Sequence, residues 1–209
     1  MGGRVGEGNL YVFLNTTFIK AKLSNRYGWS KRGKACITKL PFARGKRISI
    51  LAALDVTGFV AWEHTEDTFT RGAFHAAFLS KILPLLQPWP LPRSILILDN
   101  ARIHQYPELE DTVHSRGAIL LFLPPYSPDL NPIELGFGDL KWWISKYANL
   151  VWPHYPVEVL PIAMRLCIGE HKRESGRAFT HCGYGAHCVK DPQKDDEDEI
   201  SSSSSDEEM

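Results

Sequence analysis

Two acidic residues, Asp99 and Glu134, are placed where carboxylates could do chemistry together. Asp99 directly follows the apolar run 95–98, and 34 residues separate it from Glu134. Two carboxylates can share a hard divalent cation, because Mg²⁺ and Mn²⁺ prefer oxygen ligands. A pair of such cations ~3.5–4 Å apart would activate water and stabilise the leaving oxygen in phosphodiester chemistry. For either acid alone, a turn or a helix cap is the simpler interpretation.

Alternating strands and helices are predicted around these acids. The run 95–98 is typical of a strand buried on both faces. Apolar periodicity, prolines and glycines predict the other elements: a strand at 10–14, a hairpin of 47–56 and 58–64, a helix within 67–87 that Pro84 kinks or ends, a helix at 107–117, a buried strand at 118–124 and a helix from Asn131 or Pro132. This order predicts an α/β fold with a mixed sheet, in which ligands gather beyond the carboxyl ends of the strands.

The two acidic segments together resemble a known catalytic core. "ILILDNARIH" and "LFLPPYSPDLNPIE" are similar to the core of mariner-like transposases, which are DDE superfamily endonucleases. The segments "RYGWSKRGKA", "ISILAALDVTGFVA" and "AFTHCGY" extend the resemblance over residues 10–185. It implies an RNase H-like fold, two divalent metal ions (Mg²⁺ or Mn²⁺), and DNA strand cleavage and transfer. By this resemblance, Asp99 and Glu134 match the second and third acids of the catalytic triad, as catalytic residues and metal ligands.

The first acid of that triad is missing. The family places it at the end of the first strand, where this chain reads "YVFLNTTFIK" and offers Asn15. A neutral amide with one carbonyl oxygen is a poor replacement for a carboxylate that should bridge two cations. We therefore expect weak metal binding and impaired cleavage; the alternative is an inactive, decayed or repurposed descendant that at most binds nucleic acid. Asp55 is a possible substitute, but it matches the end of the second strand, close to the hairpin turn.

The beginning of the chain also departs from the family. Mariner-like transposases carry N-terminal helix-turn-helix modules, and "MGGRVGEGNLYVF" leaves no room for them before the first strand. The sequence therefore predicts an N-terminally truncated copy or a misplaced gene boundary. Base readout needs a helix or ribbon in a DNA groove, so we expect sequence-specific recognition to be lost.

Charge divides the chain into a basic body and an acidic tail. Residues 191–209 hold nine acids and one lysine, which leaves 15 acids against 23 Lys plus Arg in residues 1–190, although the net charge of the whole chain is zero. We predict an irregular N-terminus at 1–9, a catalytic domain at 10–190 and a disordered Ser-rich tail at 191–209. A basic body is compatible with a polyanionic partner, and a solvated basic surface is the alternative.

The densest basic stretch is the predicted DNA contact region, with a charged loop and edge strand as the alternative. It comprises Arg26, Lys31, Arg32, Lys34, Arg44, Lys46 and Arg47.

Two further features have a functional and a structural interpretation. Trp142 and Trp143 could stack on flipped bases, although at least one of two adjacent helical tryptophans should be core. His104 could position DNA or metal near Asp99, or simply cap a loop.

The remaining features indicate the compartment and partners. The four cysteines show neither CxxC spacing nor a disulfide framework, and the segment around Cys182 and Cys188 matches no familiar zinc site. No signal peptide opens the chain, and no apolar run approaches the ~20 residues of a membrane span. We expect a soluble nuclear or cytoplasmic protein whose partner is DNA, with a homodimer as a further possibility.

Overall fold

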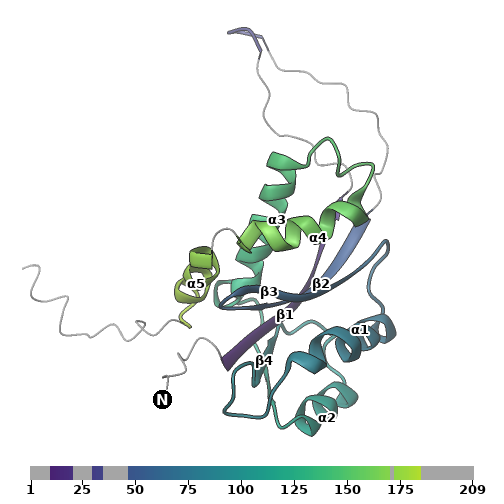
Figure 1. Ribbon diagram of the computed structural model, residues 1–209, viewed down its shortest axis with the longest axis vertical. Coiled ribbons are helices and arrows are strands. Elements are labelled where there is room, and N and C mark those ends of the chain that lie inside the picture. Colours follow the sequence, from purple (N-terminus) through teal and green to yellow (C-terminus); the bar gives the residue numbers. More distant parts are fainter. Residues whose placement is uncertain (1–9, 21–29, 35–46, 170–171, 185–209) are drawn as a thin grey trace, which may run out of the picture.

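The computed structural model describes residues 10–20, 30–34, 47–169 and 172–184, and these contain one mixed five-stranded sheet (Figure 1). The strand order is β3-β2-β1-β4-β5. Strands β1, β2 and β3 form an antiparallel meander, and β4 and β5 continue the sheet parallel to β1. Their bounds are β1 Tyr11–Lys20, β2 Arg47–Asp55, β3 Gly58–Thr65, β4 Ile95–Leu98 and β5 Ile119–Phe122.

Helices cover both faces of this sheet. In Figure 1, α3 and α4 lie on one side of the strands, and α1 and α2 lie on the other. The bounds are α1 Arg71–Ala77, α2 Pro107–Ser115, α3 Pro132–Tyr147, α4 Pro156–Gly169 and α5 Lys172–His181, with short helical turns at η2 Phe78–Ile82, η3 Leu83–Leu85 and η4 Pro128–Leu130. The predicted α/β fold with a mixed sheet flanked by helices is therefore confirmed.

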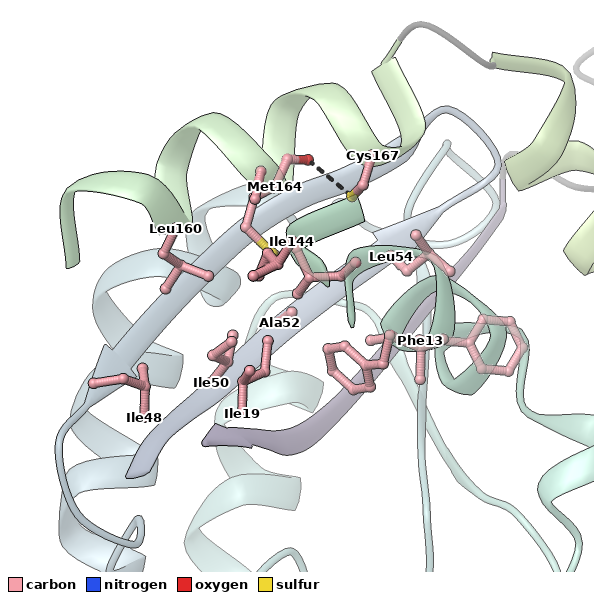
Figure 2. Close-up of a cluster of buried hydrophobic side chains, with 14 of the residues drawn as sticks. Phe13, Ile19, Ile48, Ile50, Ala52, Leu54, Ile144, Leu160, Met164 and Cys167 are labelled. Carbon is pink, nitrogen blue, oxygen red and sulfur yellow. Dashed lines mark hydrogen bonds between the residues drawn. The ribbon is translucent and has the colours of Figure 1, made fainter. Parts of the chain in front are cut away.

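Strand alternation divides the apolar side chains between two cores. Phe13 of β1 points to the α3 and α4 side, whereas Val12 and Leu14 point to the α1 and α2 side. Figure 2 shows the first core, where α4 places Leu160 and Met164 over the apolar side chains of β1 and β2. Because odd-numbered side chains of β1 face α3, Asn15 also points to that side.

The helix predicted within 67–87 is present but irregular. Thr70 caps α1, with its Oγ1 accepting a hydrogen bond from the Ala73 amide at 3.2 Å. The chain then widens into the π-helical turn η2 and tightens into the 3₁₀ turn η3, which contains Pro84. Pro84 lacks an amide proton and therefore ends the helix close to the predicted position.

The expectation of a buried strand at 118–124 is wrong in one respect. Strand β5 forms, and its flanking residues Ala118 and Leu123 are buried, but it is the edge of the sheet. Ile119, Leu121 and Phe122 are 37%, 46% and 41% exposed. An apolar run shows that a strand can be buried, but it does not show whether another element covers it.

The helices in the described parts of the chain include none with both the length and the apolar character needed to cross a membrane.

Candidate active site

Asn15, within β1, lies beside Asp99, the residue that follows the last residue of β4. Leu14 of β1 is paired with Leu98 of β4, so the next residue on each strand lies one step beyond the last pair. Parallel neighbours are ~4.8 Å apart, and side chains alternate between faces. The side chains of Asn15 and Asp99 therefore point to the face covered by α3, as the predicted location at the carboxyl ends of the strands requires.

Glu134 reaches Asn15 and Asp99 from the first turn of α3. Pro132 begins the helix, where its missing amide proton costs no hydrogen bond. Further along α3, Phe137, Leu140 and Ile144 are fully buried and fix the helix on the sheet. The Glu134 carboxylate accepts a hydrogen bond from Asn15, with Nδ2 to Oε1 at 2.8 Å. The sequence therefore brings Asn15, Asp99 and Glu134 together, although 119 residues separate the first from the last.

The Asn15 amide is held at both ends. Its Oδ1 accepts a hydrogen bond from the Thr16 backbone amide at 2.6 Å, while its Nδ2 faces Glu134. The reverse orientation would put oxygen against a carboxylate and a donor against a donor, so this network fixes which atom faces Glu134. Asn15 is only 3% exposed. The position of the first acid thus presents a hydrogen-bond donor, and not an oxygen ligand, to the other two residues.

His104 contacts the second acid directly. Its Nδ1 lies 2.6 Å from Oδ1 of Asp99, and its side chain is completely buried. The Ala101 amide donates to the same carboxylate oxygen at 3.2 Å. The imidazole also lies against the Phe74 ring, with 4.8 Å between centroids. Nε2 has no hydrogen-bond partner among the residues that the structure describes. His104 therefore belongs to the site and is more than a loop cap.

The two carboxyl groups are shifted in opposite directions. Burial acts to raise the pKa of Asp99, but the hydrogen bond and charge of His104, with hydrogen bonds from Ala101 and Asn15, outweigh it and lower the pKa. Burial raises the pKa of Glu134, and the charge of Asp99 adds to this effect while Lys141 opposes it. Opposite shifts in a shared site favour an ionised Asp99 beside a Glu134 that accepts a proton more readily.

A cavity opens over these carboxylates. It has a volume of about 460 Å³, and both Asp99 and Glu134 line it together with the Pro-rich loop that follows β5. Tyr126, at φ 59°, lies in this loop and is fully exposed. The loop thus forms one wall of an open site, large enough for part of a polymer substrate.

The donor set does not fit two divalent cations. Within the described ranges, no group of three or more His, Cys, Asp and Glu side chains is arranged to hold a metal ion. Two carboxylates remain, and the third position is an amide whose nitrogen points inward. Asp99 and Glu134 could hold one cation if Glu134 gave up its hydrogen bond, but the bridging ligand of a two-metal site is missing.

Asp55 does not replace the missing acid. Since β2 runs antiparallel to β1 and Ala52 is the partner of Asn15, Asp55 lies three residues further along β2, toward the N-terminal end of β1. There it accepts hydrogen bonds from the Thr57 amide at 2.7 Å and from Nε of Arg93 at 2.8 Å. It is 3% exposed and holds the β2–β3 turn to the segment before β4. Its role in the structure is therefore in the turn.

The predicted basic stretch is only partly described. Arg26, Arg44 and Lys46 lie outside the described residues. The exposed Lys31, Arg32 and Lys34 belong to a short turn that Figure 1 shows well apart from the sheet. Arg47 begins β2 opposite Lys20, and its guanidinium lies 4.2 Å from the centre of the Phe18 ring. None of the four described cations is placed beside the carboxylates, and the contact of the whole stretch with DNA stays a prediction.

The contacts within the site were only partly predictable from the sequence. The hydrogen bond from Asn15 to Glu134 depends on the amide orientation, which only the folded site fixes. The contact of His104 with Asp99 had a weak signal, since a histidine five residues after a strand-ending acid can turn back to it. Lys141, two helical turns after Glu134, was missed although the i to i+7 spacing places it on the same face.

The comparisons with known proteins agree with this fold. A family model described as DDE superfamily endonuclease matches residues 11–150. Among solved structures, the Mos1 transposase paired-end complex with left transposon end is 18% identical, with a TM-score of 0.51 over 78% of this chain and 55% of that chain. The Mos1 strand transfer complex is 17% identical, with a TM-score of 0.50 and the same coverage. No curated protein sequence matches the chain.

A viral integration complex has the same fold. The simian T-cell lymphotropic virus intasome in complex with PP2A regulatory subunit B56 gamma is 17% identical, with a TM-score of 0.53 over 75% of this chain and 47% of that chain. The chain spans about half the length of the matched transposase and intasome chains. At such low identity these likenesses show the fold, which is RNase H-like and confirms the predicted resemblance to mariner-like transposases. The family match covers most of the chain, which therefore belongs to the DDE superfamily endonucleases.

Proposed function

We propose that this chain is the catalytic part of a transposase-derived DDE endonuclease, whose reaction class is metal-dependent cleavage and transfer of DNA strands, and that Asn15 impairs this reaction. The 2.8 Å hydrogen bond from Asn15 Nδ2 to Glu134 Oε1 carries the proposal. It supports a site assembled as in an endonuclease, since Asp99 and Glu134 line one cavity and Asn15 is hydrogen-bonded to Glu134. It also supports impairment, because a donor occupies the position of the first carboxylate.

The proposed roles of the two acids follow from their environments. Asp99, held ionised by His104 and Ala101, is the principal ligand for a single Mg²⁺ or Mn²⁺. Glu134 would be the second ligand once a cation replaces the Asn15 amide as its partner. Because no third carboxylate completes the set among the described residues, we expect binding that is weak and limited to one cation.

A second candidate function is a DNA-binding protein without catalysis. The amide at position 15 favours it, because an Asn fully engaged by Thr16 and Glu134 stabilises the site without metal. In both cases the partner is DNA, in keeping with the transposon end named for the Mos1 complex. A protein acting on chromosomal DNA would reside in the nucleus. A homodimer is a further proposal, supported by the exposed apolar edge strand β5.

Calorimetric titration with Mg²⁺ and with Mn²⁺ tests the proposal on the full chain and on Asn15→Asp, with nicking of supercoiled plasmid assayed in parallel. We expect the natural chain to bind weakly and not to nick, and Asn15→Asp to bind at least tenfold more tightly. Asp99→Ala in the Asn15→Asp background should abolish binding. Metal-dependent nicking by the natural chain that Asp99→Ala removes would disprove impairment. Absence of metal binding in Asn15→Asp would disprove the endonuclease site itself.

A further inference from the structure

An exposed aromatic cluster lies on the same helix as Glu134. At the far end of α3, Trp142 and Tyr147 are 57% and 60% exposed, with 6.1 Å between their ring centroids. Lys146 lies over both rings, with Nζ 4.5 Å from the Trp142 centroid and 4.9 Å from that of Tyr147. By contrast, Trp143 is partly buried and packs against the core, so only one of the adjacent tryptophans is structural.

The cluster is connected to the candidate active site along α3. Trp142 is eight residues from Glu134, which corresponds to ~12 Å along a helix. Gly138 lies between them and is exposed, and a β-carbon added there would meet nothing within 4 Å. Lys141 lies one residue before Trp142 and close enough to Glu134 for its charge to oppose the rise in the pKa of that carboxyl. The segment from Glu134 to Trp142 is thus open at Gly138 and contains one lysine, Lys141, and one further acid, Asp139.

We infer that Trp142, Tyr147 and Lys146 form a binding site for single-stranded DNA, in which a base stacks on Trp142 and Lys146 contacts the adjacent phosphate. Stacking on an exposed aromatic ring tolerates any base, and a neighbouring cation holds the backbone. A path of ~12 Å is short enough for a few nucleotides to span, so the bound strand would lead toward the cavity of Asp99 and Glu134. This inference takes its ligand from the proposed function, but it needs neither metal binding nor cleavage.

The charges and the rings favour nucleic acid over a protein partner. Lys141 and Lys146 flank Trp142, and residues 140–147 include no acidic residue. A docking site for an apolar protein surface would not need two cations around its most exposed ring. However, Leu150 is 81% exposed near the end of α3, so an apolar contact between protein chains is the alternative that the experiment must separate.

The chain offers matched controls for this test. Trp89 is also 57% exposed, but it lies before β4. Its amide donates to the Gly117 carbonyl, at the end of β5 that is opposite to the Asp99 cavity. The Lys81 side chain is 50% exposed and belongs to η2 on the other face. Binding of a fluorescein-labelled 20-mer of thymidine is measured by anisotropy with the full chain in EDTA, which removes any contribution of divalent metal.

Trp142→Ala should weaken binding of the 20-mer by roughly 5- to 150-fold, the range that loss of one stacked base implies. Trp142→Phe should retain part of the affinity, and Trp89→Ala should change it less than twofold. Lys146→Gln should make the slope of log K against the logarithm of salt concentration less steep by about one half to one. Lys81→Gln should leave this slope unchanged. Circular dichroism of each variant verifies folding, which exposed positions should not disturb.

The outcomes separate this inference from the proposed function. Equal affinity of Trp142→Ala and the natural chain, equal losses at Trp142 and Trp89, or absence of DNA binding would each overturn the inference. Self-association that depends on Trp142 without DNA binding would assign the face to a protein contact. If Trp142-dependent binding is found but Asn15→Asp gains no metal affinity, the inference stands and the proposed endonuclease site fails.

Discussion

Asn15 and Glu134 form a hydrogen bond of 2.8 Å between a donor and a carboxylate where an active site of this family is expected to hold two acids. The bond removes the charge repulsion that two adjacent carboxylates would produce, and it satisfies a buried amide that is only 3% exposed. The amide therefore stabilises the fold at the position where we propose that it weakens the chemistry. This relationship predicts effects on stability that are independent of catalysis.

Asn15→Asp should destabilise the chain in the absence of metal. A carboxylate beside Glu134 and Asp99 loses the donated hydrogen bond and adds repulsion, which we expect to cost about 1–3 kcal/mol of unfolding free energy at pH 8. Millimolar Mn²⁺ should restore most of this loss, because metal binding to the native state is linked to folding. Urea denaturation in EDTA and in Mn²⁺ measures both effects. An equal stabilisation of the natural chain by Mn²⁺ would contradict the prediction.

Replacing His104 should weaken both the packing and the charge state of Asp99. His104→Ala leaves a cavity beside Phe74 and removes the imidazole partner of the Asp99 carboxylate, for an expected loss of about 2–4 kcal/mol. His104→Phe fills the space but removes the contact with Asp99. Both variants should raise the pKa of Asp99, as measured by NMR titration of its labelled carboxyl carbon. An unchanged pKa in His104→Phe would show that the histidine acts only through packing.

The pH dependence of these variants follows from the direction of the Asp99 shift. Because the folded pKa of Asp99 is lowered, its contribution to stability is present above the unfolded pKa of about 3.9 and is lost as pH falls through the folded pKa. The stability difference between the natural chain and His104→Phe should therefore be larger at pH 6 than at pH 2. Denaturation curves at the two pH values measure this difference. A stability difference that is the same at both pH values would show that His104 is not what lowers the pKa of Asp99.

Glu134→Gln should have the opposite pH dependence. The folded pKa of Glu134 is raised, so its contribution to stability is present below the unfolded pKa of about 4.3 and is lost as pH rises through the folded pKa. A neutral glutamine keeps an oxygen for the Asn15 hydrogen bond and avoids that loss. At pH 7 the variant should be more stable by less than about 1 kcal/mol, since solvent screens the partly exposed side chain. At pH 3 the two chains should have the same unfolding free energy. A lower unfolding free energy of Glu134→Gln than of the natural chain at pH 7 would contradict this prediction.

The main elements of the fold could be predicted because their signals are local. The apolar run 95–98, the proline at the start of α3 and the turn at Thr57 and Gly58 each act within a few residues. Exposure of β5 could not be predicted in this way, since it depends on which other elements reach the sheet edge. The sequence patterns also gave no prediction for α4, which contains Pro161 in its interior.

The candidate site was predictable in its residues but not in its contacts. Asp99, Glu134 and Asn15 could be identified because the resemblance supplies their positions along the chain. Packing and hydrogen bonds determine which atom of the Asn15 amide faces Glu134, a residue 119 positions away. They also determine that the His104 ring turns inward to Asp99, five positions before it. Such contacts require coordinates, because neither residue type nor spacing specifies the rotamer of a buried side chain.

The exposed edge strand predicts self-association through β5. Ile119, Leu121 and Phe122 are partly exposed on a strand whose outer backbone groups have no neighbouring strand in the described sheet. A second copy could pair with this edge and cover these side chains, which is the physical basis for the proposed homodimer. Leu121→Lys should disrupt such pairing, because a charge on an edge strand opposes the approach of another chain. Sedimentation velocity over a range of protein concentrations measures the change.

Leu150→Lys is the matched control, because Leu150 is 81% exposed after α3 and lies outside β5. Leu121 is 46% exposed, so its replacement should change the unfolding free energy by no more than about 0.5–1 kcal/mol. A shift toward monomer in Leu121→Lys and not in Leu150→Lys would locate the contact at the sheet edge. If Leu150→Lys alone gave monomers, the contact would lie beyond the end of α3, beside Trp142, and the edge strand would stay open to another partner.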